Sequence, residues 1–277
     1  MPQYQIESLP RSRRKGRMIT LPFRKGESAM AFIRRALRDF RDGVRFGFPV
    51  RCPYDVASSI GSTCEVSFNL GRFHGFVDSY PLVWAAVHSL THLPKLIEDP
   101  MFLAADQHME HLYETNQVYF PCINIAFHCQ GLPADLLGPD GKVDETKARA
   151  ERDELKSRLA YLAGKWKKLL EDPARTLLCI LTPRETGNTT EEILAIYDAL
   201  RKYPGTDLLV VLTGREESVS ASKLRSKGIF VRYITRHPPP DRTTDLQAND
   251  SLGWKRICYE FPPLQRKISN KVFKYEK

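Results

Sequence analysis

The chain has 277 residues and a mass of 31.8 kDa, with 42 Lys and Arg against 33 Asp and Glu, a formal net charge of +9. A hydrophobic content of 42% and an aromatic content of 10% are ordinary for a globular protein and exclude wholesale disorder. No apolar run approaches the roughly 18 residues that cross a bilayer, and the start of the chain has no secretory signal pattern. The six cysteines form no CxxC pair, which favours free thiols in a reducing, cytoplasmic setting.

The excess positive charge lies in the first fifth of the chain. Residues 1–51 hold thirteen Lys and Arg against four Asp and Glu, whereas the remainder holds 29 of each and is electrically balanced. From Ser28, apolar residues recur at helical spacing with arginines on the opposite face, which predicts a basic amphipathic helix after a solvated arm. We therefore expect a basic leader over residues 1–51 and a single α/β domain over residues 52–277.

The leader allows two interpretations. In the simpler one, its helix packs on the protein's own body and turns a solvated cationic face outward. In the other, residues 11–45 contact an anionic membrane or another polyanion, which would hold a cytoplasmic protein at the inner face of the membrane. The chain contains no specific nucleic-acid motif, so the charge alone does not predict a nucleic-acid partner.

The body alternates predicted strands and helices. In chain order, the expected strands are 55–60, 117–127, 176–181, 207–213, 228–235 and 256–261, and the expected helices are 65–72, 83–98, 101–114, 146–171, 189–200 and 217–226. Continuous apolar strands such as LLVVL at residues 208–212 are typical of a parallel sheet that is covered on both faces. The sequence thus predicts a doubly wound, mostly parallel α/β sheet with helices on both faces, preceded by the basic arm and the amphipathic helix.

The first strand, turn and helix form the segment best suited to chemistry. The strand ends at Gly61, and Ser62 and Thr63 then lead to Cys64 at the start of a helix. Because the positive end of a helix dipole stabilises a thiolate, Cys64 is a candidate nucleophile. Free backbone N–H groups of the same turn could hold an oxyanion. The alternative is that Cys64 is a small buried hydrophobic residue.

A cysteine nucleophile requires a base, which is usually histidine. Among the seven histidines we favour His128, because it ends a predicted strand beside a Gly-rich loop and can face Cys64. His237 also follows a predicted strand and is the second candidate. His88 and His92 lie four residues apart on a predicted helix, where they would form a polar face; without a third ligand nearby, no metal site is expected.

The residues around Cys64 resemble a bacterial family of papain-like cysteine peptidases. The resemblance is carried by SIGSTCEVSFNL at residues 59–70 and by SYPLVW at residues 79–84. It spans residues 54–235, and its specific part is the first thirty. Members of that family often occur beside surface-polysaccharide genes, and their opening is similar to that of coenzyme-A-binding acyltransferases of capsule biosynthesis.

The resemblance implies roles for four residues. Cys64 would be the nucleophile and His128 its base, while Pro81 and Trp84 would belong to the wall of the site. The family often has Phe-Asp before the tryptophan, whereas this chain has Leu-Val at residues 82–83. If that aspartate orients the histidine in the family, Asp78 or Asp55 would have to replace it here.

A second candidate contact is the turn at residues 182–189. It follows a predicted strand and opens a helix, so its backbone N–H groups and Arg184 could contact a phosphate. The simpler interpretation is an ordinary strand–helix turn. The residues expected to bind substrate are Gly61, Ser62, Thr63, Trp84 and Arg184.

These patterns favour a cysteine-dependent enzyme of acyl transfer or hydrolysis that acts on a small-molecule, peptide or glycan substrate, in surface-polysaccharide biosynthesis. The reaction requires no cofactor, although an acyltransferase could use coenzyme A. One alternative is a glycan-processing transferase without a covalent cysteine step. Another is a non-catalytic protein that binds a polyanion or a membrane surface through its basic leader.

Overall fold

The computed structural model describes residues 54–61, 65–74, 79–83, 85–105, 108–129, 131–138, 141–184, 186–235 and 250–261. All of them belong to one unit, Pro49–Lys277. The predicted leader, residues 1–51, with its amphipathic helix, lies outside the described residues.

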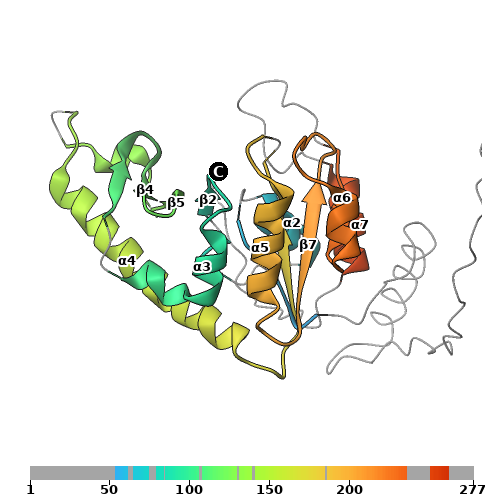
Figure 1. Cartoon of the computed structure of the whole chain (residues 1–277). Helices are drawn as coiled ribbons and strands as arrows, with labels where there is room; N and C mark the ends of the chain where they lie inside the picture. The colour runs from blue at the N-terminus through green and yellow to red at the C-terminus, as the bar shows by residue number, and fades with distance from the viewer. Residues whose placement is uncertain are drawn as a thin grey trace, which may run out of the picture. The chain divides into compact units, whose positions relative to one another are not determined.

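Four strands form a parallel sheet (Figure 1). Across the sheet they are β1 (Val56–Ser59), β6 (Leu177–Leu181), β7 (Thr206–Leu212) and β8 (Phe230–Tyr233). In the register, Val56 lies opposite Leu177 and Ser59 lies opposite Ile180, so neighbouring strands end at the same edge of the sheet. The predicted α/β class and the mostly parallel sheet are confirmed.

Helices cover both faces of this sheet. Alternate side chains enter two separate hydrophobic clusters: on β6, Cys179 belongs to one, and Leu178 and Ile180 belong to the other. The first cluster includes residues of α3 (Leu93–Glu98), α4 (Glu145–Leu170), α5 (Thr190–Leu200) and α6 (Ala221–Ser226), and the second includes residues of α2 (Glu65–His74) and α7 (Ser251–Glu260). Burial on both faces explains why β6 and β7 are almost continuously apolar.

A second, antiparallel sheet is inserted between β1 and β6 in the chain. Its strand order is β2 (Ala85–Val87), β5 (Ile125–His128), β4 (Gln117–Phe120) and β3 (Glu110–Leu112). Short 3-10 helices accompany it: η1 (Pro100–Ala104), η2 (Tyr113–Thr115) and η3 (Pro133–Leu136). The sequence patterns did not predict this sheet.

The helices predicted at 65–72, 146–171 and 189–200 are confirmed as α2, α4 and α5. The capping box of α5 is formed, because the Thr189 hydroxyl accepts from the backbone N–H of Glu192 and the Glu192 carboxylate accepts from that of Thr189. None of the described helices is long and apolar enough to span a membrane.

Two of the predicted helices are wrong. The segment 83–98 contains β2, a loop and then α3, and Pro94 explains the division, because a proline fits the first turn of a helix and not its interior. The segment 101–114 contains η1, β3 and the start of η2. His88 and His92 therefore do not form the expected polar helix face.

Two predicted strands also differ. The strand 117–127 is a hairpin of β4 and β5, with Pro121 in the turn and Asn124 in the left-handed conformation, at a φ of 54°. The strand 256–261 is wrong, because these residues belong to α7 and its end. Trp254, Ile257 and Phe261 are buried at helical spacing, and a short apolar window fits both periodicities.

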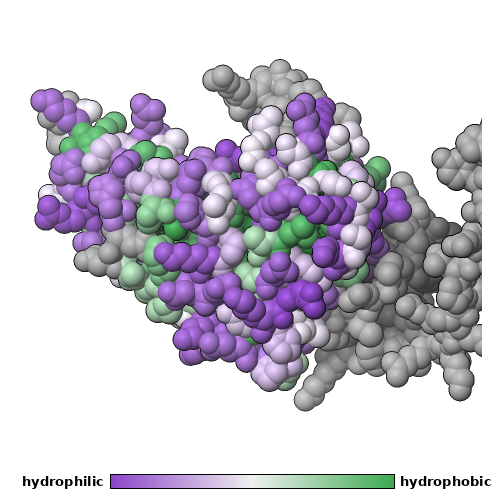
Figure 2. All heavy atoms as spheres, viewed as in Figure 1, coloured by the Kyte–Doolittle hydropathy of each residue, from purple (hydrophilic) through white to green (hydrophobic). Residues whose placement is uncertain are grey.

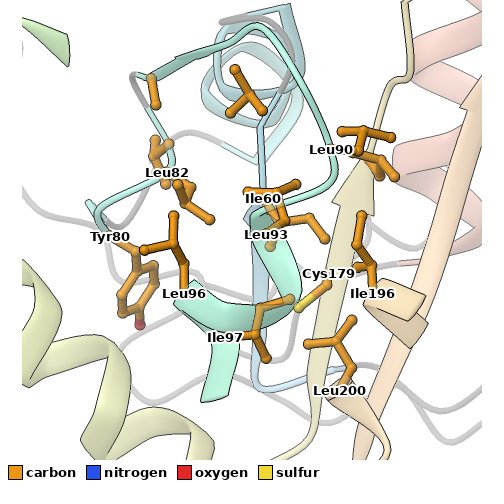
Figure 3. Packing of buried hydrophobic residues seen from close by; sticks show 14 of the residues in the cluster. Ile60, Tyr80, Leu82, Leu90, Leu93, Leu96, Ile97, Cys179, Ile196 and Leu200 are labelled. Carbon is orange, nitrogen blue, oxygen red and sulfur yellow. The ribbon is translucent and has the colours of Figure 1, made fainter. Parts of the chain in front are cut away.

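One hydrophobic cluster joins the two sheets around α3 (Figure 3). Leu93 and Ile97 of α3 belong to it, together with Ile60 after β1 and Cys179 of β6. Val87 of β2 lies in the same cluster. The end of β2 is therefore packed in the same core as the carboxyl end of β1.

Candidate functional site

The structure describes four of the predicted site residues, Gly61, Pro81, His128 and Arg184, and Pro81 is buried. The others lie outside the described residues: Ser62, Thr63, Cys64, Trp84 and the alternative base His237. The site is therefore built from the residues that flank Cys64 in the chain and from the side chains at the carboxyl edge of the parallel sheet.

Gly61 ends the strand that leads to Cys64. The backbone N–H of Ile60 still donates to the carbonyl of Ile180, at 3.1 Å, and Gly61 then adopts a φ of +126°. A Cβ atom on Gly61 would come within 2.5 Å of Cγ2 of Val87, so both the conformation and the space require glycine. Since α2 begins at Glu65, Cys64 directly precedes a helix in the chain.

The first turn of α2 is anchored on two sides. Glu65 is 1% exposed, and its Oε1 accepts a hydrogen bond of 2.8 Å from the indole N–H of Trp254 in α7. Ser67 donates to the carbonyl of Val83, at 2.7 Å. These contacts fix the start of α2.

Among the described residues, His88 is a histidine at this edge of the sheet, whereas the sequence pattern predicts it on a helix. It follows Val87, the residue against Gly61, and its backbone N–H donates to the carbonyl of Asn124, at 3.0 Å. Its ring lies edge-on to that of Tyr119, with 6.1 Å between centroids. Pro94 was the sequence signal that could have ended the predicted helix and left His88 in a loop.

Arg184 reaches His88 from the loop after β6. Its Nη2 lies 3.0 Å from Nδ1 of His88. Its backbone N–H donates to Oδ1 of Asn188, at 2.7 Å, and Asn188 is buried. A hydrogen bond to Asn188 therefore closes the predicted turn at 182–189. Arg184 and the contact between Val87 and Gly61 both lie at the carboxyl edge of the parallel sheet.

The contact with Arg184 determines the tautomer of His88. A guanidinium group only donates hydrogen bonds, so Nδ1 must accept and the neutral ring carries its proton on Nε2. Desolvation lowers the pKa of His88, and the Arg184 guanidinium lowers it further. At neutral pH His88 therefore presents an uncharged N–H donor, which suits the recognition of an acceptor better than proton abstraction.

His128, the predicted base, lies at the end of β5. Its side chain is exposed, its Nε2 lies 3.0 Å from Nε2 of Gln117, and its carbonyl accepts from Arg158. Desolvation lowers the pKa of His128, and Arg158 lowers it further. His128 lies four residues after Asn124, whose carbonyl accepts from the backbone N–H of His88. Four residues of extended strand separate Asn124 from His128 by about 13 Å. The structure therefore does not bring His128 to the Arg184–His88 pair.

Asp55, one proposed substitute for the orienting acid, is engaged elsewhere. Its Oδ2 accepts from the backbone N–H of Thr176, at 2.8 Å, and from the hydroxyl of the same residue, at 3.1 Å. Both residues precede their strands, so Asp55 lies at the amino edge of the sheet and cannot orient a histidine at the carboxyl edge. The other proposed acid, Asp78, lies outside the described residues.

The four described cysteines are free thiols: Cys122, Cys129, Cys179 and Cys258. Burial raises the pKa of Cys129 to about 11 and that of Cys258 to about 12, and it also raises the pKa of Cys179. These three are therefore poor nucleophiles at neutral pH. Within the described ranges, no group of three His, Cys, Asp or Glu side chains could hold a metal ion.

The carboxyl edge of the parallel sheet thus combines a glycine turn that leads to Cys64 with two side chains that donate hydrogen bonds. Comparisons with protein-family models, with curated proteins and with solved structures find no match. The resemblance to papain-like cysteine peptidases therefore stays a prediction.

Proposed function

We propose that the protein is an enzyme of acyl transfer or hydrolysis in which Cys64 is the nucleophile, of the papain-like cysteine peptidase type and with a role in surface-polysaccharide biosynthesis. The observation that supports this proposal is the turn at Gly61. A strand ends in a conformation that only glycine adopts readily, and a helix begins at Glu65, four residues later. This is the local arrangement that presents a nucleophile beside free backbone N–H groups.

In the proposed reaction, the Cys64 thiolate attacks a carbonyl carbon of the substrate. The C–S bond forms as the carbonyl π electrons move to oxygen, and the resulting oxyanion is stabilised by N–H donors at the edge of the sheet. When the tetrahedral intermediate collapses, the leaving group departs with a proton from the catalytic acid. Water or an acceptor hydroxyl or amine then releases the acyl group and restores the thiol. No cofactor is required, and coenzyme A could serve as the acyl carrier.

His128 is proposed as the base, and His88 has a different role. As long as Arg184 donates to Nδ1 of His88, its other nitrogen carries a proton and cannot accept one from the thiol. His128 has a neutral donor on its ring instead, because Nε2 of Gln117 lies 3.0 Å from its Nε2 and Arg158 donates only to its backbone carbonyl, so His128 can act as the base once this amide is displaced. Replacing His128 is therefore expected to lower the reactivity of Cys64, whereas replacing His88 is not.

The first prediction concerns thiol reactivity. Iodoacetamide labelling of the full chain, followed by peptide mass spectrometry between pH 5 and 9, should show Cys64 reacting about tenfold faster than the exposed Cys122 near pH 6.5, because its thiolate is stabilised. Cys64→Ala should abolish turnover of an activated acyl ester such as p-nitrophenyl acetate, whereas Cys122→Ser should leave it unchanged.

The histidine variants complete this test. His128→Gln should slow the labelling of Cys64 and flatten its pH profile, while His88→Gln should leave the thiol reactive. If Cys64 labels no faster than Cys122 and Cys64→Ala keeps full esterase turnover, the proposal fails and a reaction without a covalent cysteine step takes its place.

A further inference from the structure

We infer that Arg184 and His88 form a binding site for an oxyanion of the substrate, a phosphate or a carboxylate group, beside the turn that leads to Cys64. The inference rests on the proposed function only for the statement that this anion belongs to the substrate. The site itself consists of the Arg184 and His88 side chains at the carboxyl edge of the parallel sheet.

The two side chains offer only hydrogen-bond donors. In the part of the chain that the structure describes, the guanidinium of Arg184 has one polar contact, with Nδ1 of His88. Its remaining N–H groups face no described carboxylate. The Nε2–H of His88 likewise has no partner among the described residues. An exposed ring donor beside a guanidinium is complementary to the oxygens of an anion.

Two carboxylates on neighbouring described elements are already occupied. The carboxylate of Glu192 accepts from the hydroxyl of Thr91, at 2.8 Å, and from the backbone N–H of Thr189. Glu216 is buried and accepts from both the backbone N–H and the hydroxyl of Thr213, each at 2.9 Å. Glu185, next to Arg184 in the chain, lies outside the described residues. Neither Glu192 nor Glu216 contacts the Arg184 guanidinium.

The loops that carry both side chains are held in place before any ligand arrives. The loop that carries His88 is fastened to the start of α5 through Thr91 and Glu192, and Ser89 lies 3.0 Å from the hydroxyl of Thr91. On the other side, Asn188 closes the loop of Arg184. Ordering these groups in advance lowers the entropic cost of binding an anion.

The position also fits a ligand site. Arg184 follows β6 at the edge where β1 ends, because Ser59 and Ile180 lie opposite each other. Open α/β sheets bind ligands outside the carboxyl ends of their strands. His88 is joined to the same edge by the contact between Val87 and Gly61. An anionic group held there would lie next to the turn that leads to the proposed nucleophile.

The test is a titration of the full chain with inorganic phosphate, pyrophosphate and succinate, followed by calorimetry and by the 15N resonances of the histidine rings. We expect saturable binding and a shift of the His88 Nε2 resonance. Arg184→Gln should weaken binding at least tenfold, and His88→Gln should weaken it about threefold. Arg201→Gln, an exposed arginine at the end of α5, is the matched control and should bind like wild type.

The three ligands separate the two sources of the anion, since tighter binding of pyrophosphate indicates a phosphorylated substrate and tighter binding of succinate a carboxylate. Equal binding by wild type and Arg184→Gln, or no saturable binding at tens of millimolar, would overturn the inference. Cys64→Ala should keep the site intact. Anion binding without a reactive Cys64 therefore contradicts only the proposed function, and a reactive Cys64 without anion binding contradicts only this inference.

Discussion

His88 and His128 share a lowered pKa, but each has its own cationic neighbour. For both, desolvation is the larger cause, and the second is Arg184 for His88 and Arg158 for His128. The two arginines act differently, because Arg184 donates to the imidazole itself and Arg158 donates to a backbone carbonyl. Two histidines whose pKa is lowered in the same direction can therefore differ in which ring nitrogen is contacted and by which group.

These causes predict a specific response to substitution. Arg184→Gln should raise the pKa of His88 towards the ordinary histidine value and leave that of His128 unchanged, as measured by NMR titration of the ring protons. Arg158→Gln should do the reverse, so each variant is the control for the other. A rise of both pKa values in one variant would show that the lowering has a general cause rather than these two neighbours.

The same lowering gives the sign of a pH effect on folding. The folded pKa of His88 is below that of the unfolded chain, so its contribution to stability is complete above the ordinary histidine value. That contribution is lost as the pH falls through the folded pKa. In Arg184→Gln, less stability should be lost over this interval, as measured by urea unfolding from pH 7 down to pH 5.

At the scale of elements, the start of α2 depends on its contact with α7. The indole of Trp254 donates to Oε1 of the buried Glu65, and the loss of a hydrogen-bond partner by a buried polar group costs about 1–3 kcal/mol beyond the lost volume. We expect Trp254→Phe to lower the free energy of urea unfolding by at least this amount and to change the reactivity of the adjacent Cys64.

Trp166 in α4 is a matched control for this substitution. It is also buried, but its indole nitrogen has no hydrogen-bond partner among the described residues, so Trp166→Phe removes volume without breaking a described hydrogen bond. Its cost should be smaller than that of Trp254→Phe. Equal costs for the two variants would show that packing alone, and not the contact with Glu65, stabilises the start of α2.

The elements that could be predicted from the sequence have strong local signals. β6 and β7 are continuous apolar runs, α4 repeats buried positions over 26 residues, and α5 opens with a capping box. The antiparallel sheet lacks such signals, because β2 and β3 have three residues each and strands so short show no periodicity. The error on β2 placed His88 on a helix and removed it from the candidate site.

The turn at Gly61 was predictable because a glycine between a predicted strand and a predicted helix is a local signal for a turn. The contact that requires this glycine was not, since Val87 comes from β2, 26 residues further along the chain. The pairing of Arg184 with His88 joins residues 96 positions apart. Contacts of this kind are determined by how the two sheets pack, and local sequence patterns do not encode that packing.

At the scale of the whole molecule, the excess of positive charge is confined to residues 1–51 of the chain. The face of the described residues that is visible in Figure 2 is largely hydrophilic, with apolar residues in small, separate patches. Such a surface gives no reason to expect a large apolar docking site on that face. The body after residue 51 carries equal numbers of acidic and basic residues, so attraction to an anionic surface is expected from the leader.

The last prediction concerns that attraction. Neutralising four leader cations in the full chain, by R11Q, R13Q, R14Q and K15Q together, should greatly weaken sedimentation with vesicles that contain phosphatidylserine. Each basic residue near an anionic surface contributes about 1 kcal/mol. Because the attraction is electrostatic, wild-type binding should also fall as salt is raised from about 0.05 to 0.5 M, where the Debye length shortens.

The control removes the same charge from the body. Lys147, Arg149, Lys167 and Lys168 are exposed on α4, so their joint replacement by Gln lowers the net charge equally without touching the leader. This variant should keep most of its vesicle binding. If both quadruple variants lose vesicle binding to the same extent, the net charge of the protein governs the attraction, whatever the position of the charges. In that case the leader is not the membrane-binding segment.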